Sequence, residues 1–157
     1  MINSTLCYIE KDGRWLMLYR GRKENDPNAG KWVGVGGKFE DKESPEDCVR
    51  REVKEETGLT LLAQRLRGII TFVSDKWETE YMYLFTADRF TGEMTLCDEG
   101  DLMWVEREKV FDLPLWEGDR LFLKRITDPD SPFFSMKLRY EGEKLVEAKL
   151  NDEPFDF

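Results

Sequence analysis

The segment from Gly37 to Leu59 constrains the fold most, because it contains the start, the body and the end of one helix. Ser44 followed by Pro45 predicts the helix N-terminus. A serine side chain can accept a hydrogen bond from a free backbone N–H, and proline lacks that N–H at the first helical position. Gly58 can adopt the positive φ that ends a helix. The segment therefore predicts a helix of about four turns that begins at Pro45.

Three carboxylates, Glu52, Glu55 and Glu56, occupy neighbouring positions on this predicted helix, where like charges repel one another. A divalent cation between them would remove the repulsion. Arg51 lies one turn before Glu55 and can fix the direction of that carboxylate. The chain has no histidine, so oxygen ligands are expected, and these favour Mg²⁺ or Mn²⁺. For this acidic pattern taken alone, a solvated helix face is the alternative.

The spacing of the whole segment resembles the Nudix box of the Nudix hydrolases at every defined position. The matching residues are Gly37, Glu43, Arg51-Glu52-Val53, Glu55-Glu56 and Gly58-Leu59. The resemblance implies an α/β fold of the α+β type, the Nudix fold, with a mixed β-sheet sandwiched between helices. It also implies hydrolysis of a nucleoside diphosphate that is linked to another group.

The resemblance assigns roles to individual residues. It implies metal ligands at Glu52, Glu55 and Glu56, a ligand carbonyl at Gly36, and a further ligand at Glu99 in the acidic loop before a strand. One carboxylate must also accept a proton from water, and we expect Glu56 to be this base, with Glu52 as the alternative. The predicted catalytic residues are therefore Glu56, Glu52 and Arg51, the last through its contact with Glu55.

The rest of the sequence predicts strands and two more helices. Apolar runs at 5–10 and 15–19 flank an Asp-Gly turn and predict a β-hairpin. Further strands are predicted at 59–62, 68–73, 80–86 and 102–105, helices at 107–111 and 117–126, and a final hairpin at 133–140 and 144–150. Because no linker or repeat divides the chain, a single domain is expected over residues 1–157.

Composition restricts the partners. The net charge of −9 argues against a nucleic acid polymer, because affinity for its backbone depends on a basic surface. No apolar run approaches the roughly 20 residues of a membrane span, and the start lacks the features of a signal peptide, so a soluble, cytoplasmic protein is expected. The three cysteines lack metal-ligand spacing and are expected to be reduced. The oligomeric state stays open between monomer and homodimer.

Two stretches, from Gly30 to Lys38 and from Trp116 to Asp119, look most like the MutT-type 8-oxo-dGTP diphosphatases. That branch converts a nucleoside triphosphate to a monophosphate and pyrophosphate, which implies an oxidised purine nucleotide such as 8-oxo-dGTP as substrate. The proline that marks ADP-ribose pyrophosphatases about sixteen residues past the box is absent. ADP-ribose, a dinucleoside polyphosphate and a non-catalytic nucleotide sensor remain alternatives, although every carboxylate of the box is intact.

Two lysines are candidates for contacts to phosphate. Lys38 directly follows the glycines before the box, and Lys23 lies in a polar loop with Arg20 and Arg22. For each charge in that loop, simple solvation is the alternative.

The base needs an aromatic or apolar wall and a hydrogen-bonding side chain, and Phe72, Trp116 and Asp119 supply these types. Core packing is the alternative for the two aromatic residues, and a favourable helix-start position is the alternative for Asp119. Val33 departs from the family pattern, because relatives often have an asparagine there that bonds the base. This departure puts strict recognition of an oxidised purine in doubt.

Overall fold

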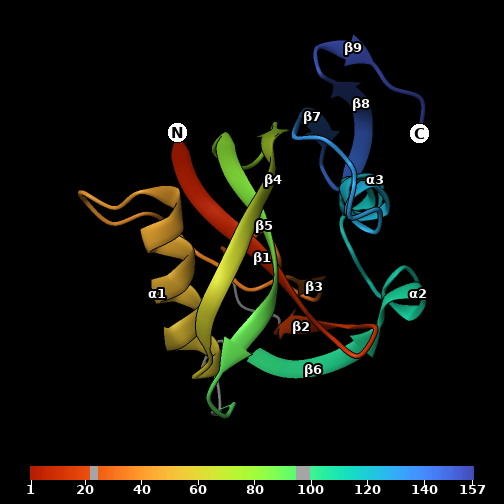
Figure 1. Cartoon of the computed structure of the whole chain (residues 1–157). Coiled ribbons are helices and arrows are strands. Elements are labelled where there is room, and N and C mark those ends of the chain that lie inside the picture. The colour runs from red at the N-terminus through yellow and green to blue at the C-terminus, as the bar shows by residue number, and fades with distance from the viewer. Residues whose placement is uncertain (22–24, 95–99) are drawn as a thin grey trace.

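The computed structural model describes residues 1–21, 25–94 and 100–157, and Figure 1 shows its elements. The strands are β1 (Ile2–Lys11), β2 (Arg14–Arg20), β3 (Trp32–Val33), β4 (Thr60–Ser74), β5 (Glu80–Thr91), β6 (Gly100–Glu106), β7 (Phe134–Glu141), β8 (Lys144–Leu150) and β9 (Glu153–Pro154). The helices are α1 (Pro45–Thr57), α2 (Arg107–Val110) and α3 (Glu117–Ile126).

The described strands join in the order β3-β2-β1-β5-β4-β7-β8-β9, and β6 pairs with β2. The pairs β1–β5 and β4–β7 are parallel, whereas β2–β6, β4–β5 and β7–β8 are antiparallel. In Figure 1, α1 lies on one side of β1, β4 and β5, and α3 lies on the other side beside β7 and β8. The predicted mixed sheet between helices is therefore confirmed.

Strand β1 separates two hydrophobic cores. Its side chains alternate between the two faces of the sheet, as the pleat requires. Cys7 and Ile9 belong to the core beneath α1, with Val49 and Val53 of that helix. Leu6 and Tyr8 belong to the core on the opposite face, which also contains apolar residues of α3, β7 and β8. Strand β1 therefore connects the core beneath α1 to the core that contains the last third of the chain.

The ends of α1 lie where the sequence predicted them. Ser44 is the N-cap and accepts a hydrogen bond from the Asp47 N–H, while the Asp47 carboxylate accepts one from the Ser44 N–H. Gly58 ends the helix with a φ of 80°. The first hairpin is also confirmed, since Asp12 and Gly13 have φ values of 54° and 76° in its turn. Both ends of α1 are therefore fixed by residues of the chain itself, without a substrate.

The prediction of two separate strands at 59–62 and 68–73 was wrong. Residues Thr60–Ser74 form one continuous strand, and β5 likewise continues to Thr91. Register shifts between β4 and β5 at Leu61/Ala63, Ala63/Arg65 and Leu66/Gly68 disturb the side-chain alternation that would have marked a single strand. Within the part of the chain that the structure describes, no helix has the length and apolar character to cross a membrane.

Candidate active site

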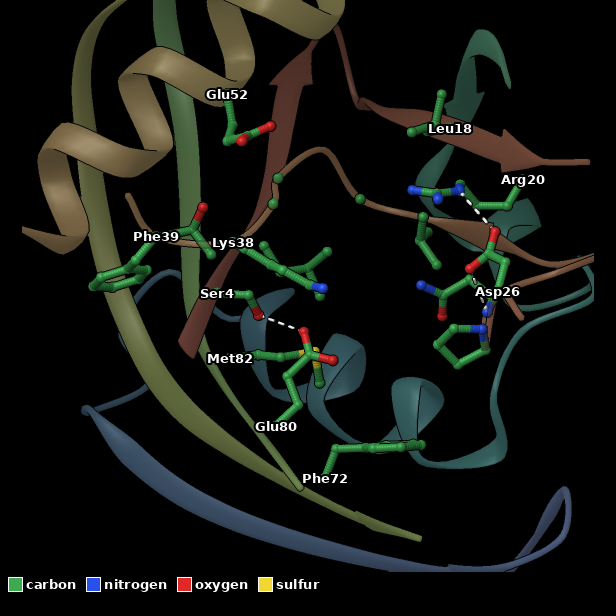
Figure 2. Close-up of a pocket in the computed structure, with 18 of the residues that line it drawn as sticks. Ser4, Leu18, Arg20, Asp26, Lys38, Phe39, Glu52, Phe72, Glu80 and Met82 are labelled. Atoms are coloured by element: carbon green, nitrogen blue, oxygen red, sulfur yellow. Dashed lines mark hydrogen bonds and ion pairs between the residues drawn. The ribbon is translucent and has the colours of Figure 1, made fainter. Parts of the chain in front are cut away.

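A cavity of about 560 Å³ extends from the loop before α1 to the start of α3. Figure 2 shows Glu52 at one end and Phe72 at the other, with Lys38, Ser4 and Glu80 between them. The lining residues include several predicted from the sequence: Gly36, Lys38, Arg51, Glu52, Phe72, Trp116 and Asp119. The structure therefore brings the box and the residues predicted for the base into one cavity.

Arg51 organises the box end of the cavity. Its guanidinium binds both oxygens of Glu43, at 2.7 and 2.8 Å, and also donates to Glu52 at 2.7 Å. The predicted contact with Glu55 is present at 3.2 Å. These bonds, above all those to Glu43, raise the pKa of Arg51, and the same guanidinium lowers the pKa of Glu43. Glu43 was recognised as part of the box, but its role in positioning Arg51 was not predicted from the sequence.

The three predicted metal-binding carboxylates differ in environment. The side chain of Glu52 is 15% exposed and faces the cavity, that of Glu55 is 58% exposed, and Glu56 is buried. Among the described residues, no group of three His, Cys, Asp or Glu side chains is placed to hold one ion. Arg51 lies between Glu52 and Glu55 and contacts both carboxylates. The predicted ligand Glu99 lies outside the described residues.

Gly36 and Gly37, at the start of the box, allow a close backbone approach. A Cβ at Gly36 would lie 1.9 Å from the Thr5 carbonyl oxygen, and one at Gly37 would lie 2.5 Å from the Glu52 carboxyl carbon. The carbonyls of Val35 and Gly37 accept hydrogen bonds from β1. Because carbonyls alternate along extended backbone, that of Gly36 is directed away from β1, where it is available as a ligand.

The donor types at this end suit a hard divalent cation. They are carboxylate oxygens of the box together with a backbone carbonyl, and Mg²⁺ prefers such oxygen ligands. Glu52 faces the cavity, and the space beside its carboxylate is kept free of a Cβ by Gly37. The residues present therefore fit the group that the family uses.

Cations also line the cavity. The side chain of Lys38 points into it in Figure 2. Lys23, the other predicted phosphate contact, lies outside the described residues. Arg20, from the same polar segment, lines the cavity and forms an ion pair of 3.2 Å with Asp26. The sequence offered Arg20 as one of several loop charges but gave no reason to choose it, because the pairing with Asp26 depends on the loop conformation.

The far end of the cavity is aromatic. The ring centroids of Phe72 and Trp116 lie 5.2 Å apart, and Tyr140 of β7 lies 4.8 Å from Trp116 and 5.2 Å from Phe72. Phe72 and Trp116 are buried members of the core and also line the cavity. Both sequence interpretations of these residues, core packing and cavity wall, therefore describe part of their environment.

Asp119 lies in the first turn of α3 and is 7% exposed. Burial raises the pKa of its carboxyl to about 7, against the opposing effects of Arg120 and Lys31. The neighbouring Gly118 N–H donates to the Tyr140 hydroxyl at 2.7 Å, so strand β7 holds the start of this helix. Asp119 is thus a buried acid at the cavity, held in place from a strand that follows it in sequence.

Val33 is buried, lines the cavity and pairs with Leu18 of β2. This part of the cavity is therefore apolar, as its sequence implied. Two polar contacts that were not predicted from the sequence lie in the same cavity. Ser4 donates to Glu80 at 2.5 Å, and Asn28 accepts from the Trp116 indole at 3.0 Å. No local motif marks either pair.

Comparison with known proteins identifies the family to which the fold and the box belong. The NUDIX domain matches residues 3–126, so the chain belongs to the Nudix hydrolase family. Nudix hydrolases generally use divalent metal ions. The predicted family and enzyme class are confirmed.

Similar proteins agree with the MutT-like branch. The chain is 33% identical to the oxidized purine nucleoside triphosphate hydrolase of Danio rerio, over 94% of this chain and 93% of that protein. It is 36% identical to the Nudix hydrolase YvcI of Bacillus subtilis strain 168, over 73% of this chain and 72% of the relative. The crystal structure of the mutator MutT protein from Bacillus halodurans superposes with a TM-score of 0.86 at 29% identity, covering 98% of this chain and all of that one.

Proposed function

We propose that this chain hydrolyses an oxidised purine nucleoside triphosphate, such as 8-oxo-dGTP, to the monophosphate and pyrophosphate. The observation that carries the proposal is the single cavity joining the box to a buried aromatic and acidic end. A triphosphate and its purine can occupy these two ends together. The similarity to an oxidized purine nucleoside triphosphate hydrolase over 94% of the chain supports the choice of base.

At the phosphate end, Glu52, Glu55, Glu56 and the Gly36 carbonyl would hold Mg²⁺ or Mn²⁺, with Glu99 as a further ligand. When bound, such an ion neutralises phosphate oxygens and lowers the pKa of a bound water. We assign Glu56 as the group that accepts the proton of the attacking water, with Glu52 as the alternative.

The surrounding cations complete the phosphate end. Arg51 keeps Glu52 and Glu55 directed by its hydrogen bonds, and Glu43 holds Arg51 in turn. Lys38 projects into the cavity and would bind a phosphate oxygen. The chain's own residues therefore orient the carboxylates and balance the charge of the substrate.

At the base end, Trp116 and Phe72 supply flat apolar surfaces for a purine, and the carboxyl of Asp119 supplies a polar contact. Because Asp119 is buried, a hydrogen bond to it is not weakened by competing water. This end would therefore determine which base is accepted, whereas the box would determine the reaction.

The test is a comparison of kcat/KM for 8-oxo-dGTP, dGTP, ADP-ribose and a dinucleoside tetraphosphate. Nucleoside monophosphate and pyrophosphate are quantified by chromatography at several Mg²⁺ and Mn²⁺ concentrations. We expect the highest kcat/KM for 8-oxo-dGTP, and no turnover in excess EDTA. A higher value for ADP-ribose or the dinucleotide, or equal values for 8-oxo-dGTP and dGTP, would overturn the proposal.

A further inference from the structure

Asn28 lies between β2 and β3 and lines the cavity beside Trp116. Its Oδ1 accepts the hydrogen bond from the Trp116 Nε1. An indole N–H only donates, so the contact fixes the orientation of the amide, with the oxygen toward Trp116 and the NH₂ group away from it. Within residues 1–21, 25–94 and 100–157 the structure gives that NH₂ group no acceptor. Asn28 thus offers a donor to a ligand of the cavity.

This donor is held in place before a ligand binds. The Asn28 N–H donates to the Asp26 carboxylate at 3.0 Å. Lys31, at the end of the same loop, places its ammonium 4.4 Å from the centre of the Trp116 ring. The Trp32 N–H donates to the Pro114 carbonyl at 2.9 Å. Because these contacts join the loop to the segment that carries Trp116, the amide and the aromatic wall form one preorganised unit.

The apolar side chain at position 33 increases the need for such a donor. Val33 lines the cavity but cannot form a hydrogen bond with a base. A buried polar group of a purine that found no partner would cost free energy on binding. Asn28 would supply such a donor from the loop rather than from strand β3.

The pair of polar groups beside Trp116 matches one kind of purine edge. Asn28 presents a donor, and Asp119, whose N–H donates to the Trp116 carbonyl, presents a carboxyl that can accept. A guanine-type base has the O6 acceptor next to the N1–H and amino donors, which is the complementary order. An adenine-type base has a donor at position 6 and an acceptor at N1, so its order is reversed.

We propose that Asn28 is a specificity-determining residue that donates from Nδ2 to the O6 carbonyl of a 6-oxo purine held against Trp116. The inference rests on the proposed function, because it names which oxidised purine the site prefers. Guanine-type nucleotides are favoured over adenine-type nucleotides.

The decisive variant is Asn28→Asp, assayed with 8-oxo-dGTP and 8-oxo-dATP. The variant keeps an oxygen for the Trp116 indole and replaces the NH₂ donor with a second acceptor. We expect kcat/KM for 8-oxo-dGTP to fall about tenfold to a hundredfold, mainly through KM, and the preference over 8-oxo-dATP to fall by about tenfold or more. Asn3→Asp on β1 is the matched control, since it adds the same charge at an exposed residue that does not line the cavity and should leave the preference unchanged.

Asn28→Ala, which removes the donor without adding charge, repeats the test if the aspartate variant does not fold. An equal fall for both bases would show that Asn28 only supports Trp116 and would overturn the inference, as would unchanged kinetics for both. The parental ratio of 8-oxo-dGTP to dGTP tests the proposed function separately. If that ratio is near one, the ratio of dGTP to dATP in the parent and in Asn28→Asp still tests the role of Asn28.

Discussion

The two ends of the cavity are built in different ways. The box end comes from one continuous stretch, Gly36 to Gly58. Its carboxylates Glu43, Glu52 and Glu55 are partly exposed and are connected through Arg51. The base end combines residues from the β2–β3 loop, β4, α3 and β7, and its aromatic members are buried in a shared core. Polar contacts there join residues far apart in sequence, such as Asn28 and Trp116, which are 88 positions apart.

This difference separates the residues that carry out the reaction from the residues that determine which base is bound. The box end depends on local helix geometry, so it can be recognised from spacing alone, and its substitutions should change turnover more than the fold. The base end depends on tertiary packing, so its substitutions should change KM and stability together.

Replacement of the proposed base has the largest expected effect. Glu56→Gln should lower kcat by about 10²–10⁴-fold, because a positioned base contributes that much to proton transfer. The thermal midpoint should stay close to that of the parent. Glu46→Gln on the same helix is the control and should retain parental turnover. Near-normal turnover in Glu56→Gln would remove Glu56 from the role of base.

The pH dependence of stability comes next. In the unfolded chain Asp119 loses its proton near the ordinary value of 3.8, whereas burial raises its folded pKa to about 7. Between these two pH values the folded state binds more protons than the unfolded chain does. The contribution of protonated Asp119 to the free energy of unfolding is therefore fully present below about pH 3.8 and is lost as the pH rises through about 7. The loss is on the order of 4 kcal/mol.

Urea unfolding of the parent and of Asp119→Asn between pH 4 and pH 8 measures this effect. The stability of the parent relative to the variant should decline across the interval and level off above pH 7. If the free energies of unfolding of the parent and the variant run parallel with pH throughout, Asp119 titrates at its ordinary pKa. Water then reaches the base end more easily than the burial of Asp119 indicates.

Metal binding tests the box end without catalysis. Mg²⁺ should raise the thermal midpoint, since an ion that binds only the folded state at a concentration of 100 times Kd stabilises it by about 2.7 kcal/mol. The double variant Glu52→Gln, Glu56→Gln should lose this response, whereas Asp119→Ala should keep it. A parental response in the double variant would place the metal elsewhere.

Asp119→Ala removes the polar contact at the base end. We expect KM for purine substrates to rise, selectivity between 8-oxo-dGTP and dGTP to weaken, and kcat/KM to fall about tenfold to a hundredfold, corresponding to about 1.5–3 kcal/mol. Steady-state kinetics with both nucleotides provide the measurement. Parental kinetics for both would leave Asp119 as a helix-start residue with no part in base recognition.

Tyr140→Phe has the smallest expected effect. The variant keeps the ring beside Trp116 but removes the acceptor for the Gly118 N–H, so the free energy of unfolding should fall by about 1 kcal/mol. KM should rise, by less than in Asp119→Ala, with kcat unchanged. Tyr83→Phe, whose ring packs on Phe39, is the control. A fall in kcat alone would contradict the separation of the two ends.

The sequence predicted the box end well because its information is local. The cap at Ser44, the stop at Gly58 and the contact of Arg51 with Glu55 follow from helical spacing and turn chemistry. The helix start near Trp116 and Asp119 was predicted for the same reason, and both residues line the cavity. Local periodicity was therefore sufficient wherever one helix positions the residues.

Contacts between distant segments were not predictable in this way. The amide of Asn28, the carboxylate of Glu80 and the hydroxyl of Tyr140 each depend on a partner in another segment of the chain. Strand β4 was divided in the prediction because its register shifts hide the alternation of a single strand. Glu99 and Lys23 stay predictions, since they lie outside the described residues.

Tyr140 connects the base end of the cavity to a part of the chain outside the family match. The family match ends at residue 126, yet Tyr140 of β7 contacts the aromatic wall and the start of α3 from beyond that limit. Two proteins can therefore share every residue of the box and still diverge in the base they accept, through changes in a hairpin that carries no catalytic group. In such a lineage, selectivity can evolve while the hydrolytic machinery stays untouched.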